Sequence, residues 1–181
     1  MRKQINFDMD GTLVDFYGVE GWLDDLMNRN TRPYREAKPR INFSSLARLL
    51  NKAQRNGYEI CVISWLAKNS TKEFDEAVTQ TKLDYLKKRL PSVKWDKITI
   101  VPYGTPKSTC GNGILFDDEA PNRNEWKGTA YDVDNILEIL KALDWAFNFC
   151  ANCLLTKCGR RADNRDARNF HYTTLFALLS S

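Results

Sequence analysis

Two aspartates stand one residue apart directly after a short apolar run near the start of the chain. Asp8 and Asp10 follow the strand-like residues 3–7, and Gly11 and Thr12 come immediately after them. Alternate side chains of a strand point the same way, so the two carboxylates are expected to converge where the strand ends. Neighbouring carboxylates are costly to bury unless a cation or a proton lies between them. The arrangement therefore indicates a site of chemistry more than a stabilising turn.

Short apolar runs alternate with longer amphipathic stretches along the rest of the chain. Strands are expected over residues 58–64, 96–101, 114–118 and 128–131, and helices over residues 16–30, 44–57, 70–90, 119–127 and 132–149. Ser44 or Ser45 and Ser70 or Thr71 are expected to cap two of the helices, and residues 30–42 to form a loop. This alternation predicts an α/β fold, a Rossmann-like three-layer sandwich with a central parallel sheet of about five strands.

Polar residues gather where the predicted strands end. Ser64 ends the second strand, Lys107 lies in the loop after the third, and Asp117 and Asp118 follow the fourth. Ligands of parallel sheets bind at this edge, so these side chains and the two N-terminal aspartates are expected to form one site. Oxygen-only ligands favour Mg²⁺. The one histidine, His171, lies in the tail, so a histidine-based zinc catalytic site is not expected.

These four motifs, in this order, resemble the signatures of the haloacid dehalogenase-like phosphohydrolases. The resemblance covers residues 3–132 and consists of the Asp-x-Asp-Gly-Thr stretch at 8–12, an apolar strand ending in Ser64, Lys107 after a Gly-Thr-Pro turn, and an apolar strand followed by two aspartates. It implies a Mg²⁺-dependent phosphatase in which Asp8 attacks phosphorus and Asp10 acts as general acid and base. Magnesium would be held by Asp8, the carbonyl of Asp10 and Asp117, with Asp118 acting through water.

The same resemblance implies which residues surround the phosphoryl group. The expected phosphate-binding residues are Met9, Gly11, Thr12, Ser64, Trp65 and Lys107. Backbone amides of the turn over residues 9–11 could hold phosphoryl oxygens, and Lys107 would neutralise phosphate charge while keeping the nucleophile ionised.

Residues 16–43 leave room only for a small helical cap. A small cap leaves an open site, suited either to a large substrate such as a polynucleotide end or to closure by a partner subunit. Residues 117–130 are similar to small phage and bacterial proteins grouped with 5′-nucleotidases, and the first motif is similar to the deoxyribonucleotidase branch. This implies a (deoxy)nucleoside monophosphate, although the short cap and the Trp65-Leu66 pair depart from that branch. Phe16, Tyr17, Tyr34 and Trp65 are candidates to stack on a base and Arg40 to meet a second anionic group, whereas Trp22 is expected in the core.

Two alternatives stay open at this point. One is a phosphatase of polynucleotide 3′ ends or of sugar phosphates. The other is a non-catalytic binding protein that keeps this scaffold, although four charged motifs argue against it. The chain carries a net charge of +4, and the last 31 residues hold five basic and two acidic side chains. The body is therefore nearly neutral, so nucleic acid is a possible but not a favoured partner.

The chain is expected to divide into a core domain over residues 1–149 and a basic tail over residues 150–181. Cys150, Cys153, Cys158 and His171 do not follow a familiar zinc spacing, so the cysteines are expected to pack as small apolar side chains. The tail could dock on the body or form a homodimer contact. No signal peptide or membrane-spanning run is evident, and five unevenly spread cysteines favour reduced thiols in the cytoplasm.

Overall fold

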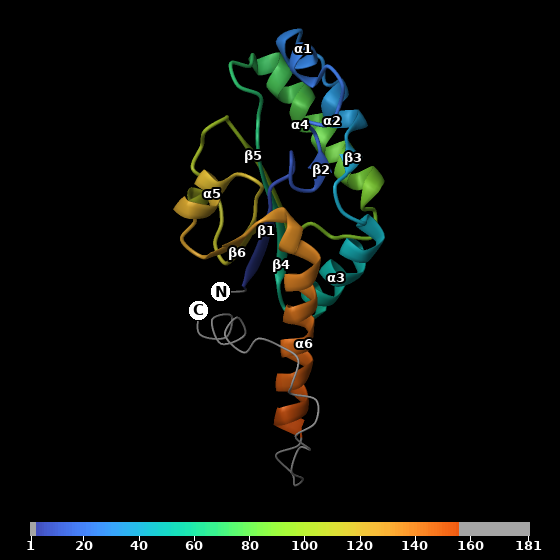
Figure 1. The fold of residues 1–181 in the computed structure, drawn as a ribbon, viewed down its shortest axis with the longest axis vertical. Coiled ribbons are helices and arrows are strands. Elements are labelled where there is room, and N and C mark those ends of the chain that lie inside the picture. Colours follow the sequence, from blue (N-terminus) through green and yellow to red (C-terminus); the bar gives the residue numbers. More distant parts are fainter. Residues whose placement is uncertain (1–2, 156–181) are drawn as a thin grey trace.

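The computed structural model describes residues 3–155, with side chains for residues 3–146, and its centre is one parallel sheet (Figure 1). Its strands are β1 (Gln4–Phe7), β4 (Glu59–Trp65), β5 (Lys97–Val101), β6 (Ile114–Phe116) and β7 (Thr129–Tyr131). They lie in the order β5-β4-β1-β6-β7, with every neighbouring pair parallel. The predicted Rossmann-like α/β sheet of five strands is confirmed, and β1 is its middle strand.

Helices cover both faces of the sheet. They are α3 (Phe43–Arg55), α4 (Lys72–Arg89), α5 (Ala120–Glu125) and α6 (Ile136–Leu155), with single 3₁₀ turns η1 (Lys107–Thr109) and η2 (Val133–Asn135). Successive side chains of a strand pack into two different hydrophobic cores. In β6, Ile114 and Phe116 belong to the larger core, whereas Leu115 belongs to a smaller one with Ile63 and Trp126. Side chains of successive strand residues point to opposite faces, so each buried strand serves both layers.

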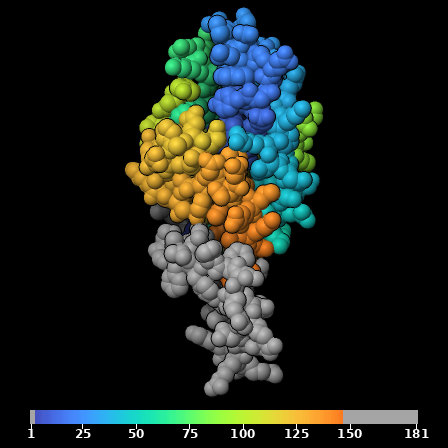
Figure 2. Space-filling view, in the orientation of Figure 1, coloured from blue at the N-terminus to red at the C-terminus, as the bar shows by residue number. Residues whose placement is uncertain are grey.

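A small insertion leaves the core after β1 and returns before α3. It enters and exits through a two-stranded antiparallel ribbon, β2 (Val14–Asp15) and β3 (Lys38–Pro39), and carries α1 (Trp22–Met27) and α2 (Arg32–Glu36). Helix α2 packs on both α1 and α4. In Figures 1 and 2 the blue insertion lies beside the green N-terminal part of α4, above the sheet-bearing body. We call residues 16–37 the cap.

The cap differs from the expected long helix followed by a loop. Only Trp22–Met27 of the predicted helix over 16–30 is helical, because Gly21 precedes it in a left-handed conformation and Arg29, also left-handed at φ 54°, follows it. The predicted loop over 30–42 contains α2 and β3. Pro33 lies in the first turn of α2, where its missing N–H breaks no helical hydrogen bond.

The helix ends show how local chemistry sets the boundaries. Asn42, rather than Ser44 or Ser45, caps α3, and its side chain accepts a hydrogen bond of 2.9 Å from the amide of Ser45. Thr71 caps α4, as one of the two predicted alternatives. Helix α6 extends to Leu155, so residues 150–155 of the predicted tail are helical.

The tail predictions mostly lie outside the described residues. These include Cys158 and His171, and the side chains of Cys150 and Cys153. Within the described part, Cys61 is a buried free thiol and Cys110 a half-buried one. No helix of that part is long and apolar enough to cross a membrane.

Candidate active site

The centre of the site is a buried triad of Asp8, Lys107 and Asp117. The amide of Asp8 donates to the carbonyl of Phe116 over 2.9 Å, which holds the ends of β1 and β6 side by side. The Lys107 ammonium then donates to Asp8 Oδ1 over 2.7 Å and to Asp117 Oδ2 over 2.6 Å. All three side chains are buried. The structure therefore brings together three residues that the sequence placed at separate strand ends.

The triad carries excess negative charge. Burial raises the pKa of Asp8 from 3.8 to about 7, Lys107 opposes this, and the carboxylates of Asp117 and Asp10 add to the increase. Burial alone would lower the pKa of Lys107, but the Asp8 and Asp117 carboxylates outweigh it and the pKa is raised. The pKa of Asp118 is raised by burial and by Asp117, although the Thr12 hydrogen bond counteracts this. One ammonium thus does not compensate the carboxylates around it.

Asp117 is held from behind by the segment that begins α5. The Asn122 side chain donates to Asp117 Oδ1 over 3.1 Å, and the amide of Glu119 donates to the same oxygen over 2.9 Å. Arg123 donates to the carbonyls of Asp117 and Asp118, each over 2.7 Å. This framework fixes the carboxylate in one orientation, since both of its oxygens are engaged.

Asp118 is fixed by the turn after β1. Thr12 donates to Asp118 Oδ1 over 3.1 Å and accepts from the Asp118 amide over 3.0 Å. Gly11 has φ 87°, and a Cβ atom there would lie 2.3 Å from Asp118 Oδ2. The amide of Gly11 donates to the carbonyl of Val14 over 2.8 Å. Gly11 and Thr12 build the turn that holds Asp118, and their expected role in phosphate binding stays a prediction.

Asp10 lies on the other side of the site and is paired with a residue that the sequence reasoning missed. Lys82 of α4 is fully buried, and its ammonium donates to Asp10 Oδ2 over 2.5 Å, Ser64 Oγ over 2.8 Å and the carbonyl of Trp65 over 2.6 Å. The available signal was its position, because Lys82 continues the buried stripe that Phe74 and Val78 begin at intervals of four residues. A lysine in an apolar helical stripe needs a buried partner.

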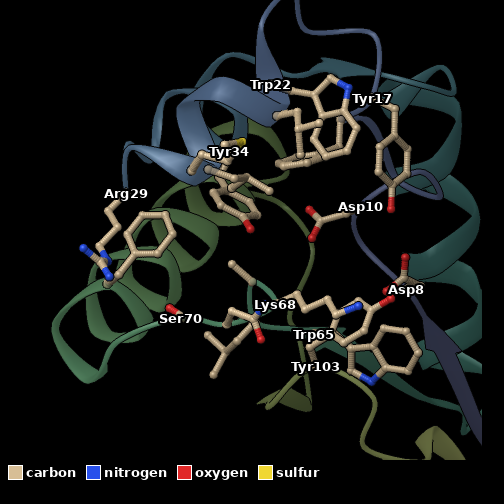
Figure 3. A pocket seen from close by; sticks show the side chains of 18 of the residues that line it. Asp8, Asp10, Tyr17, Trp22, Arg29, Tyr34, Trp65, Lys68, Ser70 and Tyr103 are labelled. Carbon is tan, nitrogen blue, oxygen red and sulfur yellow. The ribbon is translucent and has the colours of Figure 1, made fainter.

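A cavity of about 650 Å³ opens between the strand ends that carry these aspartates and the cap. Its cap wall is mostly apolar and aromatic, formed by Phe16, Tyr17, Trp22, Leu23, Leu26, Met27 and Tyr34, with the charged Arg29 among them. Figure 3 shows Asp10 extending toward Tyr34, with Asp8 and Trp65 on one side and Arg29 and Ser70 at the remote end. A ligand that reaches Asp8 through this cavity would therefore meet aromatic side chains.

The expected substrate residues fall into two groups. Phe16, Tyr17, Tyr34 and Trp65 all line the cavity, and Trp22, expected in the core, lines it as well. Arg40 is not among the lining residues; its guanidinium donates to the carbonyl of Gly11 over 2.7 Å and so supports the turn from outside the cavity. Trp65 is fixed by a 2.8 Å hydrogen bond from its indole to the carbonyl of Thr105, and its ring lies 4.9 Å from the Lys107 ammonium.

The expected magnesium ligands, Asp8, the carbonyl of Asp10 and Asp117, stay a prediction. Within residues 3–146, no three carboxylate, histidine or cysteine side chains form a ready-made metal cluster. The carboxylate of Asp10 turns to Lys82 and that of Asp118 to Thr12. Mg²⁺ is often held by one or two carboxylates with waters and substrate oxygens, so Asp8 and Asp117 fit such a site. The raised pKa of Asp8 is the expected sign of a carboxylate that lacks part of its counter-charge.

The fold is thus a Rossmann-like α/β sandwich in which the strand ends that carry the aspartates face a small helical cap. No family model matches the sequence, and no curated protein matches it. The D,D-heptose 1,7-bisphosphate phosphatase from Burkholderia thailandensis is similar with 12% identity and a TM-score of 0.49, over 80% of this chain and 98% of that protein. A crystallised target protein from Vibrio cholerae is 18% identical, with a TM-score of 0.39, over 77% of this chain and 97% of that one. The function of this chain is therefore inferred from its own site residues.

Proposed function

We propose that this chain is a Mg²⁺-dependent phosphomonoesterase of the haloacid dehalogenase-like superfamily that acts on (deoxy)nucleoside monophosphates. The observation that carries the proposal is the position of Asp8, a buried carboxylate at a strand end, held by Lys107 and facing a cavity that Asp10 also lines. The four sequence motifs of that superfamily contribute Asp8, Asp10, Ser64, Lys107 and the Asp117-Asp118 pair to this one edge of the sheet.

In the first step, a carboxylate oxygen of Asp8 attacks phosphorus and the P–O bond to the leaving group breaks. The Lys107 ammonium donates a hydrogen bond to Asp8 Oδ1, and no described residue donates to Oδ2. Asp8 Oδ2 is therefore the attacking atom. Asp10 gives its proton to the departing alkoxide, so that a neutral alcohol leaves. The product is an aspartyl-phosphate on Asp8.

In the second step, water attacks the phosphorus of the aspartyl-phosphate. Asp10, now a carboxylate, takes a proton from that water, and the bond between phosphorus and the Asp8 oxygen breaks. Inorganic phosphate is released and both aspartates return to their starting states. Bound Mg²⁺, held by Asp8 and Asp117, would supply charge neutralisation for the phosphoryl group. Lys107, which also lines the cavity, provides further positive charge beside the phosphoryl group.

The aromatic cap wall supports a nucleotide as substrate. Tyr17 and Trp22 pack edge to face at 5.1 Å, and both line the cavity together with the exposed Leu23 and Met27. An aromatic base has flat apolar faces that gain stacking energy on such side chains, whereas a sugar phosphate has no aromatic face to stack on them.

A panel of phosphate esters, assayed for phosphate release with Mg²⁺ or with EDTA, tests the proposal. We expect Mg²⁺-dependent turnover, fastest with nucleoside monophosphates, and its loss in the Asp8→Asn variant. Preference for polynucleotide 3′-phosphates or sugar phosphates would overturn the substrate assignment. Absence of turnover with every ester would favour a non-catalytic binding protein on this scaffold.

A further inference from the structure

Lys82 is a buried cation whose hydrogen-bonding capacity is fully committed. An ammonium has three N–H groups, and the structure provides three acceptors: Asp10 Oδ2, Ser64 Oγ and the carbonyl of Trp65. The side chain has no exposed surface, and the Tyr34 ring lies 4.9 Å from Nζ. The chain brings this charge from the middle of α4, where an apolar residue would satisfy the packing of the helix.

The commitment of Lys82 determines what its partners can do. The Lys82 ammonium donates to Asp10 Oδ2. The other oxygen of that carboxylate, Oδ1, is buried and has no hydrogen-bond partner among the described residues. Because Ser64 Oγ accepts a hydrogen bond from Lys82, its own hydroxyl hydrogen must be donated elsewhere. Lys82 therefore links Asp10, which lines the cavity, to Ser64, which is fully buried and does not line it.

We propose that Lys82 is a positioning residue that holds the Asp10 carboxylate in place at the cavity by linking it to Ser64 and to the Trp65 carbonyl at the end of β4. This inference rests on the proposed phosphatase function. It adds a second positioning lysine to that function. Lys107 holds the nucleophile Asp8, and Lys82 holds the acid–base group Asp10. Without Lys82, the Asp10 carboxylate would lose its link to Ser64 and to the Trp65 carbonyl and would be free to rotate.

The test compares two substrates that differ in the leaving group. Phosphoryl transfer to Asp8 needs a proton from Asp10 when an alkoxide leaves, as from a nucleoside 5′-phosphate, but hardly when the acidic p-nitrophenol leaves. In Lys82→Met we expect kcat/KM to fall by about 10²- to 10³-fold for the nucleoside ester and by less than about tenfold for p-nitrophenyl phosphate. Lys88→Met, an exposed lysine of the same helix, is the matched control and should leave both values unchanged.

Asp10→Asn shows whether Lys82 acts through Asp10. This variant should reproduce the leaving-group dependence, and adding Lys82→Met to it should cause little further loss for the nucleoside ester, because residues that act as one unit are not additive. If Lys82→Met does not fold, Lys82→Arg keeps the charge but cannot reproduce the three-acceptor geometry, and it should show the same selective loss.

The outcomes separate this inference from the proposed function. A wild-type protein that hydrolyses no ester overturns the proposed function. An active wild type whose Lys82 variants lose both substrates equally, or neither, overturns only the role of Lys82. Full additivity of Lys82→Met and Asp10→Asn would also overturn it, because Lys82 would then act independently of Asp10.

Discussion

Replacing Asp8 with asparagine is predicted to stabilise the metal-free protein above neutral pH. The folded chain keeps the Asp8 proton up to about pH 7, whereas the unfolded chain releases it near the ordinary value of 3.8. A group with a raised folded pKa contributes stability below its unfolded pKa, and this contribution is lost as pH rises through the folded pKa. Between pH 3.8 and about 7, the contribution of Asp8 to the free energy of unfolding falls by about 1.4 kcal/mol per pH unit, or up to about 4 kcal/mol in all.

Asparagine keeps the shape of the side chain and an oxygen for Lys107 but does not titrate. The free energy of unfolding of Asp8→Asn relative to wild type should therefore change little near pH 4, rise between pH 4 and 7 and level off above it. Urea unfolding in EDTA at several pH values measures this difference. Asp134→Asn, which changes an exposed carboxylate, is the control and should follow the wild type in parallel.

Mg²⁺ provides the second half of this experiment. A ligand that binds only the folded state at a hundredfold excess over its Kd stabilises by about 2.7 kcal/mol. We expect such a gain for the wild type at pH 8 and a much smaller one for Asp8→Asn, because the variant lacks a metal ligand. Wild-type and Asp8→Asn curves that stay parallel from pH 4 to 8 would refute the reasoning, since Asp8 would then carry no raised pKa.

Three further substitutions test other parts of the site. Lys107→Met should cost about 3–5 kcal/mol in urea unfolding at neutral pH, because it leaves two buried carboxylates without their cation; a loss below 1 kcal/mol would contradict the buried triad. Gly11→Ala should cost about 1–2 kcal/mol through its positive φ and reduce phosphate release by displacing Asp118, while wild-type turnover in that variant would show that the turn tolerates a Cβ. Tyr85→Phe should cost about 1–3 kcal/mol, because the Ala37 carbonyl would lose its buried 2.7 Å hydrogen bond; unchanged stability would mean that water replaces the hydroxyl.

Much of the site could be predicted because it follows from the ends of strands. Apolar runs mark the strands, and the polar residue after each run must lie at the same edge of a parallel sheet. That rule predicts Asp8, Ser64, Lys107 and Asp117 at one edge, and the structure brings Asp8, Lys107 and Asp117 into contact there. It does not depend on long-range detail, since strand direction alone decides which end of each strand faces the ligand.

The cap could not be predicted in the same way. Trp22 was expected in the core because it continues a helical apolar pattern, yet it both packs on Phe16 and lines the cavity. Arg40 was expected to contact substrate because it is basic and lies near the cap, but it supports the Gly11 carbonyl. In a short insertion, left-handed residues such as Gly21 and Arg29 decide where each face points. A periodic pattern does not reveal such turns.

The sequence by itself determined the sheet, its parallel direction and the edge at which the charged motifs meet, because periodicity and strand polarity are local properties. Only the tertiary structure decided which charges are paired. Lys82 meets Asp10 across 72 positions of sequence and Lys107 meets Asp8 across 99. Lys82 and Lys107 can be buried beside these aspartates only when each ammonium reaches its acceptors within hydrogen-bonding distance. That distance is set by the packing of α4 and η1 against the strand ends.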